Sequence, residues 1–168
     1  MTKSERERLF LDLFQNRRSS LQRLCYGFLG SSQDVEDLFQ EIMTNVWNSL
    51  PSFRGESALN TWVYRIAVNT ALVYRKKMKR GEELPELPDA GISAHQNLEQ
   101  KERLAALRRA IASLADQDRL IVTLLLEGLS YKEIAEITGL TVNYVGVKIS
   151  RSKQTIEQLM TEVNHGGI

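Results

Sequence analysis

An aromatic ring, a cation and an amide recur at helical spacing in the segment that ends in the basic run RKKMKR, residues 75–80. Trp62, Arg65, Asn69 and Lys76 are three, four or seven residues apart, so a helix places them on one face. A ring can stack on an unstacked base, an amide can read a base edge, and cations hold phosphates. This combination indicates single-stranded nucleic acid as the ligand. The alternatives are a core tryptophan and a solvated basic end of the helix.

A second pattern, at residues 130–149, predicts a helix-turn-helix, the unit that places a helix in the DNA major groove. Ser130 and Glu133 have the spacing of a capping box, which starts a short helix. Gly139 ends that helix because glycine readily adopts the left-handed turn conformation. Thr141 is an acceptable N-cap for the next helix, and Val145 fills the shared core.

The window 140–153 also alternates apolar and polar residues, as a half-buried strand does. The helix is favoured because the apolar stripe continues at helical spacing to Ile156 and Leu159. Gly146 costs about 1 kcal/mol in a helix interior, and burial of four or five apolar side chains outweighs that cost.

A third candidate site is acidic. Asp37, Gln40 and Glu41 occupy positions i, i+3 and i+4, so they share one helix face. Such a face is either simply solvated or docks on a partner.

Catalytic patterns are not visible in the sequence. It contains no Ser/His/Asp set, phosphate loop or cysteine cluster, and neither His95 nor His165 has a metal ligand at suitable spacing. Cys25 lies in an apolar helical pattern, which predicts a buried, inert thiol rather than a reactive one. We therefore expect a protein that is not an enzyme and binds no cofactor, metal or small-molecule substrate.

The elements that must position these residues are helices. Apolar spacing predicts helices over about 4–29, from Ser32 or Gln33 to about Leu50, and from Leu59 onward, followed by 98–112, a helix capped by Asp116, and the helix-turn-helix. Expected core positions include Leu59, Val63, Ile66, Thr70 and Val73 in the first half, and Leu104, Leu107, Ile111, Val142, Val145, Ile149, Ile156 and Leu159 in the second.

Charge divides the chain into three parts. Residues 1–80 carry 13 Lys or Arg against 8 Asp or Glu, residues 81–100 carry none against 5, and residues 101–168 carry 9 against 8. Residues 81–97 also contain two prolines and two glycines without helical periodicity, which predicts a flexible acidic linker. The fold class is therefore all-α, with small helical domains at 1–80 and 98–168.

A family resemblance rests on both domains. The segment EGLSYKEIAEITGLTVNYVGVKISRSKQTI resembles the C-terminal DNA-reading domain of bacterial sigma factors of the extracytoplasmic-function group. The segments DVEDLFQEIMTNVW and LPSFRGESALNTWVYRIAVNTALVYRKKMKR resemble the other conserved domain of that family. The similarity covers residues 10–80 and 98–160 in family order.

The resemblance implies roles for particular residues. The acidic face, Asp37, Gln40 and Glu41, would dock on the clamp helices of the largest subunit of core RNA polymerase. The −10 promoter element would be melted and captured by Phe53, Arg54, Ser57, Ala58, Trp62, Arg65, Asn69, Lys76 and Lys77. The −35 element would be read by Thr141, Asn143, Tyr144, Lys148, Arg151 and Lys153.

The resemblance also implies partners and location. These are core polymerase, including its flap region, promoter DNA, and an anti-sigma factor that clamps between the domains. The chain would be cytoplasmic and nucleoid-associated through polymerase, or held at the inner membrane by an anti-sigma factor. The N-terminus, residues 1–10, is charged and lacks the apolar core of a secretory signal.

Two other functions fit the residues alone. A DNA-binding regulator of another class would use only the helix-turn-helix, and a helical adaptor would bind proteins without DNA. The linker, for its part, is either an inert tether or an acidic mimic of nucleic acid inside the polymerase.

Overall fold

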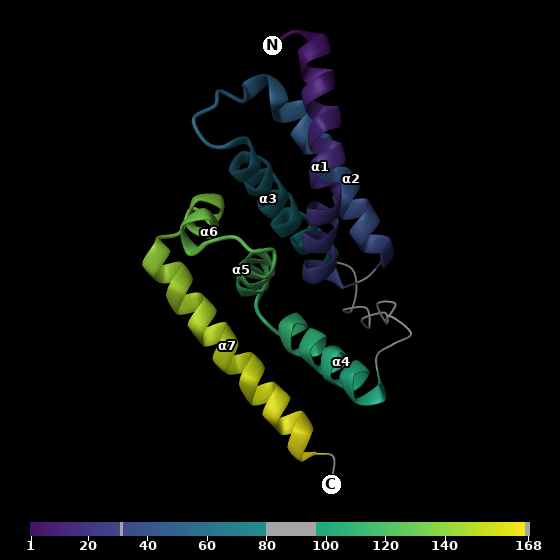
Figure 1. Cartoon of the computed structure of the whole chain (residues 1–168), viewed down its shortest axis with the longest axis vertical. Helices are drawn as coiled ribbons and strands as arrows, with labels where there is room; N and C mark the ends of the chain where they lie inside the picture. Colours follow the sequence, from purple (N-terminus) through teal and green to yellow (C-terminus); the bar gives the residue numbers. More distant parts are fainter. Residues whose placement is uncertain (31, 80–96, 167–168) are drawn as a thin grey trace.

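The computed structural model describes residues 1–30, 32–79 and 97–166. Within these ranges the chain forms seven α-helices and one 3-10 turn and contains no strand, which confirms the predicted all-α class. In chain order they are α1 (Lys3–Leu29), α2 (Ser32–Ser49), η1 (Leu50–Ser52), α3 (Leu59–Lys79), α4 (Leu98–Ala112), α5 (Asp116–Leu126), α6 (Tyr131–Thr138) and α7 (Val142–His165) (Figure 1).

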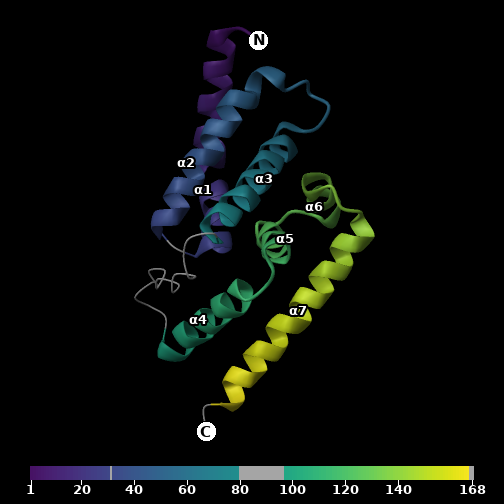
Figure 2. The same cartoon turned by 180° about the vertical axis from the view of Figure 1, so that it is seen from behind.

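The first three helices pack against one another and bury one apolar face each. Leu21, Leu24 and Phe28 of α1 are almost completely buried, as are Leu38 and Ile42 of α2. The side-chain amide of Asn45 donates to the hydroxyl of Thr70 at 3.0 Å, which joins α2 to α3 beside this core. Figures 1 and 2 show α1, α2 and α3 as one bundle.

The second group of helices is organised around α5 and ends in the predicted helix-turn-helix. Ser130 and Glu133 form a complete capping box at the start of α6, and Gly139 ends that helix with a φ of 77°. The hydroxyl of Thr141 accepts from the backbone N–H of Tyr144, so Thr141 caps α7 as predicted. Val145 and Ile149 of α7 are buried, which confirms that residues 142–153 are helical.

The two groups are packed together rather than held apart. Leu120, Ile121 and Leu124 of α5 belong to the same buried hydrophobic cluster as the core of α1–α3. In both views α5 lies between the first bundle and the long α7, and α6 lies beside α3 (Figures 1 and 2). No pattern in the sequence predicted this contact. The predicted linker, 81–97, falls outside the described residues except for Asn97, whose side chain caps α4.

Several expected core positions are not fully buried. Leu104, Leu107 and Ile111 of α4 are only half-buried, whereas Ala106 and Ala110 on another face are buried. These alanines face α7, where small side chains allow the two helices to approach closely, and the larger residues line a groove described below.

Other expectations about individual positions were also wrong. Val73 and Val142 are exposed, and Ile156 and Leu159 are half-buried outside the core cluster. Leu59 and Ile66 are also only half-buried, but they pack against the core as expected. Asp116 does not cap α5, because the N-cap is Ala115, which makes no side-chain capping bond. The carboxylate of Asp116 instead faces the basic side chains of α3.

No helix in the described part of the chain is both long enough and apolar enough to span a bilayer.

Candidate nucleic-acid interfaces

A polar pocket lies where the loop after η1 meets the start of α3. Its walls enclose about 500 Å³ and consist of Ser52, Phe53, Arg54, Glu56, Ser57, Trp62 and Arg65, a set that we call the loop pocket. The rings of Phe53 and Trp62 tilt toward each other with their centroids 5.0 Å apart. Five residues predicted to contact the −10 element therefore come together around one hollow.

The loop pocket is held in place by the short η1 turn. Leu50 is fully buried beneath it, and the backbone N–H of Phe53 donates to the carbonyl of Leu50 at 3.1 Å. Gly55, with a φ of 73°, lets the loop turn back toward α3 in a conformation that other residues rarely adopt. Trp62 is half-buried, so its ring is neither a core side chain nor fully solvated.

The other four residues predicted to contact the −10 element lie outside the pocket wall. Asn69, Lys76 and Lys77 are exposed on α3, and Ala58 is exposed just before that helix begins. Asn69 lies seven residues after Trp62, so it continues the same helix face two turns further on. The basic run adds positive charge at the end of this face.

The exposed surface of α7 carries most of the residues predicted to read the −35 element. Thr141, Asn143, Tyr144, Arg151 and Lys153 are all exposed. Because Lys153 follows Tyr144 by nine residues, it lies about half a turn around the helix from Tyr144. Tyr144 and Arg151 therefore share one flank of α7, and Lys153 lies on the other.

Lys148 is held by a neighbouring helix. Its Nζ lies 2.8 Å from Oδ1 of Asp118 on α5 and 5.2 Å from the centre of the Tyr144 ring. Only 16% of its side chain is exposed. A phosphate contact by Lys148 would have to compete with Asp118.

Gly146 faces a protein neighbour rather than open solvent. A Cβ built on Gly146 would lie 3.6 Å from the ring of Tyr131 on α6, an ordinary van der Waals distance. A side chain at this position would begin against Tyr131, at the junction of α6 and α7.

The predicted acidic face of α2 is mostly exposed and lies near Tyr74 of α3. Asp37 and Gln40 are exposed, and Glu41 is half-buried. Burial raises the pKa of the Tyr74 phenol, and the charges of Asp34, Asp37 and Glu41 raise it further. The carboxylates of Asp34, Asp37 and Glu41 therefore lie near enough to the Tyr74 phenol of α3 to disfavour its anion.

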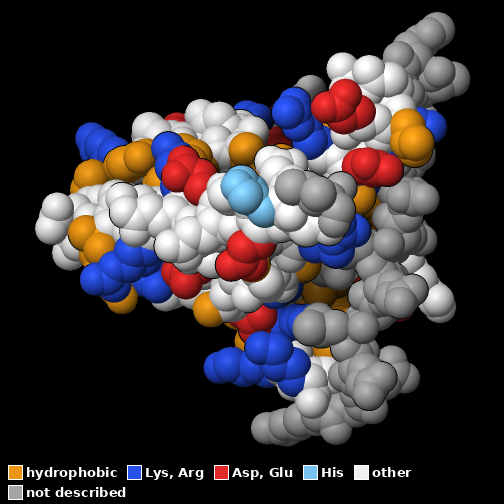
Figure 3. Space-filling model, turned by 90° about the horizontal axis from the view of Figure 1, so that it is seen from below, with side chains coloured by type: hydrophobic (Ala, Val, Ile, Leu, Met, Phe, Trp, Pro, Cys, Tyr) orange, Lys and Arg blue, Asp and Glu red, His pale blue; other side chains and the backbone are white. Residues whose placement is uncertain are grey.

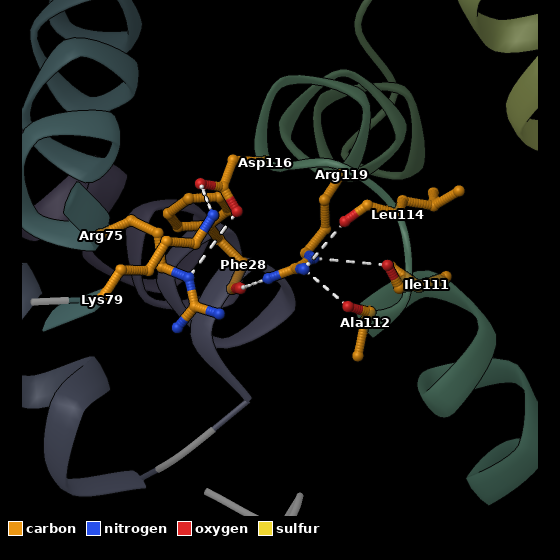
Figure 4. Close-up of polar contacts among 8 residues, drawn as sticks. All are labelled: Phe28, Arg75, Lys79, Ile111, Ala112, Leu114, Asp116 and Arg119. Carbon is orange, nitrogen blue, oxygen red and sulfur yellow. Dashed lines mark hydrogen bonds and ion pairs between the residues drawn. The ribbon is translucent and has the colours of Figure 1, made fainter. Parts of the chain in front are cut away.

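One buried arginine, which the sequence did not single out, connects the two groups of helices. Arg119 of α5 is 5% exposed, and its guanidinium donates to the backbone carbonyls of Phe28, Ala112 and Leu114 at 2.6–2.9 Å and of Ile111 at 3.3 Å. Figure 4 shows this guanidinium between the end of α1 and the α4–α5 turn. The carbonyls at the ends of α1 and α4 lack intrahelical partners, and one cation satisfies them. Burial lowers the pKa of Arg119, and the charge of Arg75 lowers it further.

Ion pairs at the same junction were also missed. Asp116 Oδ2 lies 2.8 Å from Nζ of Lys79, and Oδ1 lies 3.7 Å from Nε of Arg75 (Figure 4). Arg65, a wall of the loop pocket, donates through Nη2 to the backbone carbonyl of Glu136 on α6 at 2.9 Å. The basic run at residues 75–80 and the acidic first turn of α5 indicate such pairing only weakly, because 37 residues of chain separate Lys79 from Asp116.

A larger, mainly apolar groove of about 670 Å³ lies between α1, α4 and α5. Tyr26, Leu104, Leu107, Ile111 and Leu126 contribute to its walls, and the Tyr26 hydroxyl is buried without a hydrogen-bond partner. We call it the α1–α4–α5 groove.

Two further observations bear on the chemistry of the surface. Among the described residues no group of three or more His, Cys, Asp or Glu side chains could hold a metal ion. On the face seen from below in Figure 3, acidic and basic side chains lie among one another, so that face offers DNA a mixed surface rather than a continuous basic one.

Comparison with known proteins assigns the two groups of helices to one family. Residues 13–81 match the family model of sigma-70 region 2, and residues 104–156 match that of sigma-70 region 4. The first match contains α2, the loop pocket and α3, and the second contains the helix-turn-helix.

Curated proteins and solved structures agree with this assignment. The ECF RNA polymerase sigma-E factor of Escherichia coli K12 is 39% identical over 140 residues, which cover 75% of this chain and 73% of that protein. The RNA polymerase sigma-H factor of Pseudomonas aeruginosa is 32% identical over 153 residues, which cover 82% of this chain and 78% of that protein.

Two solved complexes share the fold. The sigma factor RpoE of Bartonella quintana, bound to the anti-sigma factor NepR, matches with a TM-score of 0.70 at 21% identity over 89% of this chain and 97% of that one. CnrH, bound to the cytosolic domain of CnrY, matches with a TM-score of 0.69 at 22% identity over 93% of this chain and 90% of that one. The chain belongs to the extracytoplasmic-function (ECF) group of the sigma-70 family, and it is a sigma factor that directs promoter-specific transcription initiation.

Proposed function

We propose that residues 1–80 form the domain that binds core polymerase and the −10 element, and that residues 98–168 form the domain that binds the −35 element. The observation that carries this proposal is the loop pocket, where Phe53 and Trp62 stand beside Arg54 and Arg65 at one end of the basic face of α3.

The loop pocket suits an extruded base. Unstacking a base costs a few kcal/mol, and a pocket with an aromatic wall and polar groups offsets this cost. Asn69 reads a base edge further along α3, and Lys76 and Lys77 hold the phosphates of the same strand. The chain thereby stabilises the melted −10 element.

The helix α7 docks in the major groove of the −35 element with its N-terminal end foremost. Thr141, Asn143 and Tyr144 lie at that end, where a recognition helix contacts base edges. Arg151 and Lys153, on opposite flanks, hold the two phosphate backbones that border the groove. Lys148 adds a phosphate contact when it leaves Asp118.

The polymerase contacts use different surfaces. The acidic face of Asp37, Gln40 and Glu41 docks on the clamp helices of the largest subunit, and residues 98–168 contact the flap region. Because the relatives NepR-bound RpoE and CnrY-bound CnrH pair with other proteins, we propose that an anti-sigma factor binds this chain as well. The α1–α4–α5 groove supplies apolar surface for it.

The polymerase performs the chemistry in this proposal, and the chain itself is not an enzyme and holds no cofactor. It works in the cytoplasm, associated with the nucleoid through polymerase, or is held at the inner membrane by its anti-sigma factor.

Reconstitution tests the proposal. The purified chain, added to core polymerase and genomic DNA fragments, should give discrete run-off transcripts whose sequences define a shared promoter. An operator-binding regulator would bind DNA without conferring initiation, and a helical adaptor would bind protein without any effect of DNA. Either outcome would refute the proposal.

A further inference from the structure

We propose that Asp118 of α5 is a positioning residue for the −35 surface of α7. Its carboxylate holds the ammonium of Lys148 beside the Tyr144 ring and away from DNA phosphates, so that binding to DNA is weaker but more selective. This inference rests on the proposed docking of α7 in the −35 major groove, and it assigns a role in that docking to a residue of another helix.

The contact between Asp118 and Lys148 is short and partly enclosed. Nζ of Lys148 donates a hydrogen bond to Oδ1 of Asp118 at 2.8 Å. The exposed fractions of the two side chains are 16% for Lys148 and 28% for Asp118. Salt and water screen a partly buried pair less than a fully exposed one. The carboxylate of Asp118 is therefore a strong competitor for this ammonium when DNA approaches.

The place of Lys148 on α7 shows what the carboxylate withholds. Tyr144, Lys148 and Arg151 are separated by four and three residues, so they lie along one flank of the helix. Tyr144 and Arg151 are exposed, whereas Lys148 is half-buried and bonded to α5. A phosphate backbone along this flank would meet the free charge of Arg151, but it would find the charge of Lys148 already neutralised.

The N-terminal half of α7 has no second cation to compensate. Lys148 is the only charged residue from Val142 to Ser150. Gly146 lies two residues before Lys148 and hence on the opposite flank, where a Cβ would meet the ring of Tyr131 at 3.6 Å. This half of the helix therefore presents polar and aromatic groups to DNA without an unpaired charge.

The same ion pair restricts the ring of Tyr144. Nζ of Lys148 lies 5.2 Å from the centre of this ring, within the range of a cation–π attraction. The backbone N–H of Tyr144 is bound by the hydroxyl of Thr141, so the main chain is fixed as well. An ammonium anchored at Asp118 favours one orientation of the exposed ring, and a group held in one orientation recognises its ligand more selectively.

Removal of the Asp118 charge therefore has two opposite consequences. Lys148 is released to make the phosphate contact, and since phosphate contacts carry no sequence information, affinity rises for DNA of any sequence. The Tyr144 ring loses its anchored neighbour, so discrimination at the base pair that it contacts falls. A variant that was merely destabilised would instead bind all DNA more weakly.

Asp118→Asn provides the first test, because it removes the charge and keeps the shape of the side chain. The full-length chain is titrated onto a labelled mixed-sequence DNA duplex, and binding is followed by fluorescence anisotropy. One added phosphate contact steepens the salt dependence by about 0.9 in log affinity per log salt. Asp118→Asn should therefore bind more tightly than the wild type at low salt, and this advantage should shrink about 3.5-fold between about 0.05 and 0.2 M salt.

Three further variants control this measurement. Asp118→Glu retains the charge and should bind as the wild type does. Lys148→Met leaves no ammonium to release, so adding Asp118→Asn to it should not steepen the salt dependence. Glu157→Gln removes an exposed carboxylate elsewhere on α7 and should also leave the salt dependence unchanged. If Asp118→Asn lowers the helical circular dichroism, Asp118→Ser, which keeps a polar group in the first turn of α5, replaces it with the same expectations.

Selectivity is measured with reconstituted holoenzyme. The templates are a promoter defined by its run-off transcripts and copies of it altered at single −35 positions. We expect Asp118→Asn to lower discrimination at the position that Tyr144 contacts by about two- to fivefold, which corresponds to about 0.5–1 kcal/mol. Asp118→Glu should restore the discrimination of the wild type.

The outcomes separate this inference from the proposed function. If folded Asp118→Asn has the salt dependence of the wild type, or steepens it equally with Lys148→Met, Asp118 does not withhold Lys148 and the inference is wrong. Tighter binding without a loss of discrimination would overturn the positioning of Tyr144. If the wild type gives no discrete transcripts with core polymerase, the proposed function itself fails, whatever the duplex titrations show.

Discussion

The side chains that line the loop pocket and continue its face along α3 differ in how freely they can meet a ligand. Trp62 is half-buried against Phe53, Arg65 is tied to α6, and Asn69 is exposed without a described hydrogen bond. The packed rings of Phe53 and Trp62 lose little conformational freedom when a ligand binds. The exposed amide of Asn69 is positioned only by the backbone of α3. We therefore propose the base-reading role for Asn69 and the stacking role for Trp62.

Asn69→Ala should lower selectivity among −10 sequences while core binding stays intact, because Asn69 is exposed and removing it alters no packing. The measurement is transcription from promoters altered at single −10 positions, beside the affinity of the variant for core. Asn16→Ala, at an exposed position of α1, is the control. Equal loss of selectivity and core affinity would make Asn69 a structural residue.

Cys25 illustrates a residue whose chemistry the fold suppresses. The thiol is completely buried, and burial raises its pKa to about 12. Since only the thiolate reacts, alkylation by iodoacetamide near pH 8 should be slow in the folded chain and fast in urea. Rapid alkylation without denaturant, followed by mass spectrometry, would contradict the burial of α1 against α2 and α3.

Elements were predictable where their signals are local, and less so where a distant helix decides. Thr141, Gly139 and the Ser130–Glu133 box lie within a few residues of the ends that they cap, and all three predictions were confirmed. Asp116 was expected to cap α5, but Arg75 and Lys79 attract its carboxylate from α3. Leu104, Leu107 and Ile111 were expected to be core residues, because the sequence does not reveal that α1 faces them across a groove.

The turn between α4 and α5 depends on Arg119. Arg119→Met keeps the length of the side chain but leaves the carbonyls of Phe28 and Leu114 buried without a donor. We expect a loss of about 1–3 kcal/mol in the free energy of unfolding, measured by urea denaturation. Arg109→Met, on the exposed side of α4, should change it by less than about 0.5 kcal/mol. Similar losses of unfolding free energy in both variants would show that the hydrogen bonds from Arg119 to its four acceptors contribute little to stability.

The acidic face of α2 is a prediction at the scale of one helix. Asp37→Ala combined with Gln40→Ala should weaken binding to core polymerase, because both side chains are exposed and removing them cannot disturb the core of α1–α3. Glu36→Ala removes an exposed charge from the neighbouring face and serves as the control. If the double variant binds core polymerase as tightly as the wild type does, docking through this face is refuted.

The whole molecule departs most from what the sequence indicated. Two helical domains and their order were evident from periodicity, charge and resemblance, but their mutual packing was not. It depends on Arg23 with Glu127, Arg65 with Glu136 and Arg119 with Phe28, pairs separated by 71 to 104 residues of chain. No local pattern encodes such pairs.

The ion pairs between the two groups of helices predict a salt effect at this scale. Salt screens exposed pairs such as Lys79 with Asp116, so the contact between the groups should weaken as ionic strength rises. The radius of gyration in solution scattering should then increase. A radius that stays constant between about 0.05 and 0.5 M salt would mean that apolar packing alone holds the two groups together.

The cation at position 119 ties the two groups of helices together unevenly. Three of its four acceptors lie at the end of α4 and in the turn after it, and only the carbonyl of Phe28 belongs to α1. The α4–α5 turn would therefore keep most of its hydrogen bonds to Arg119 if α1 moved away, so the shape of this turn depends on α4 and α5 more than on the contact with α1.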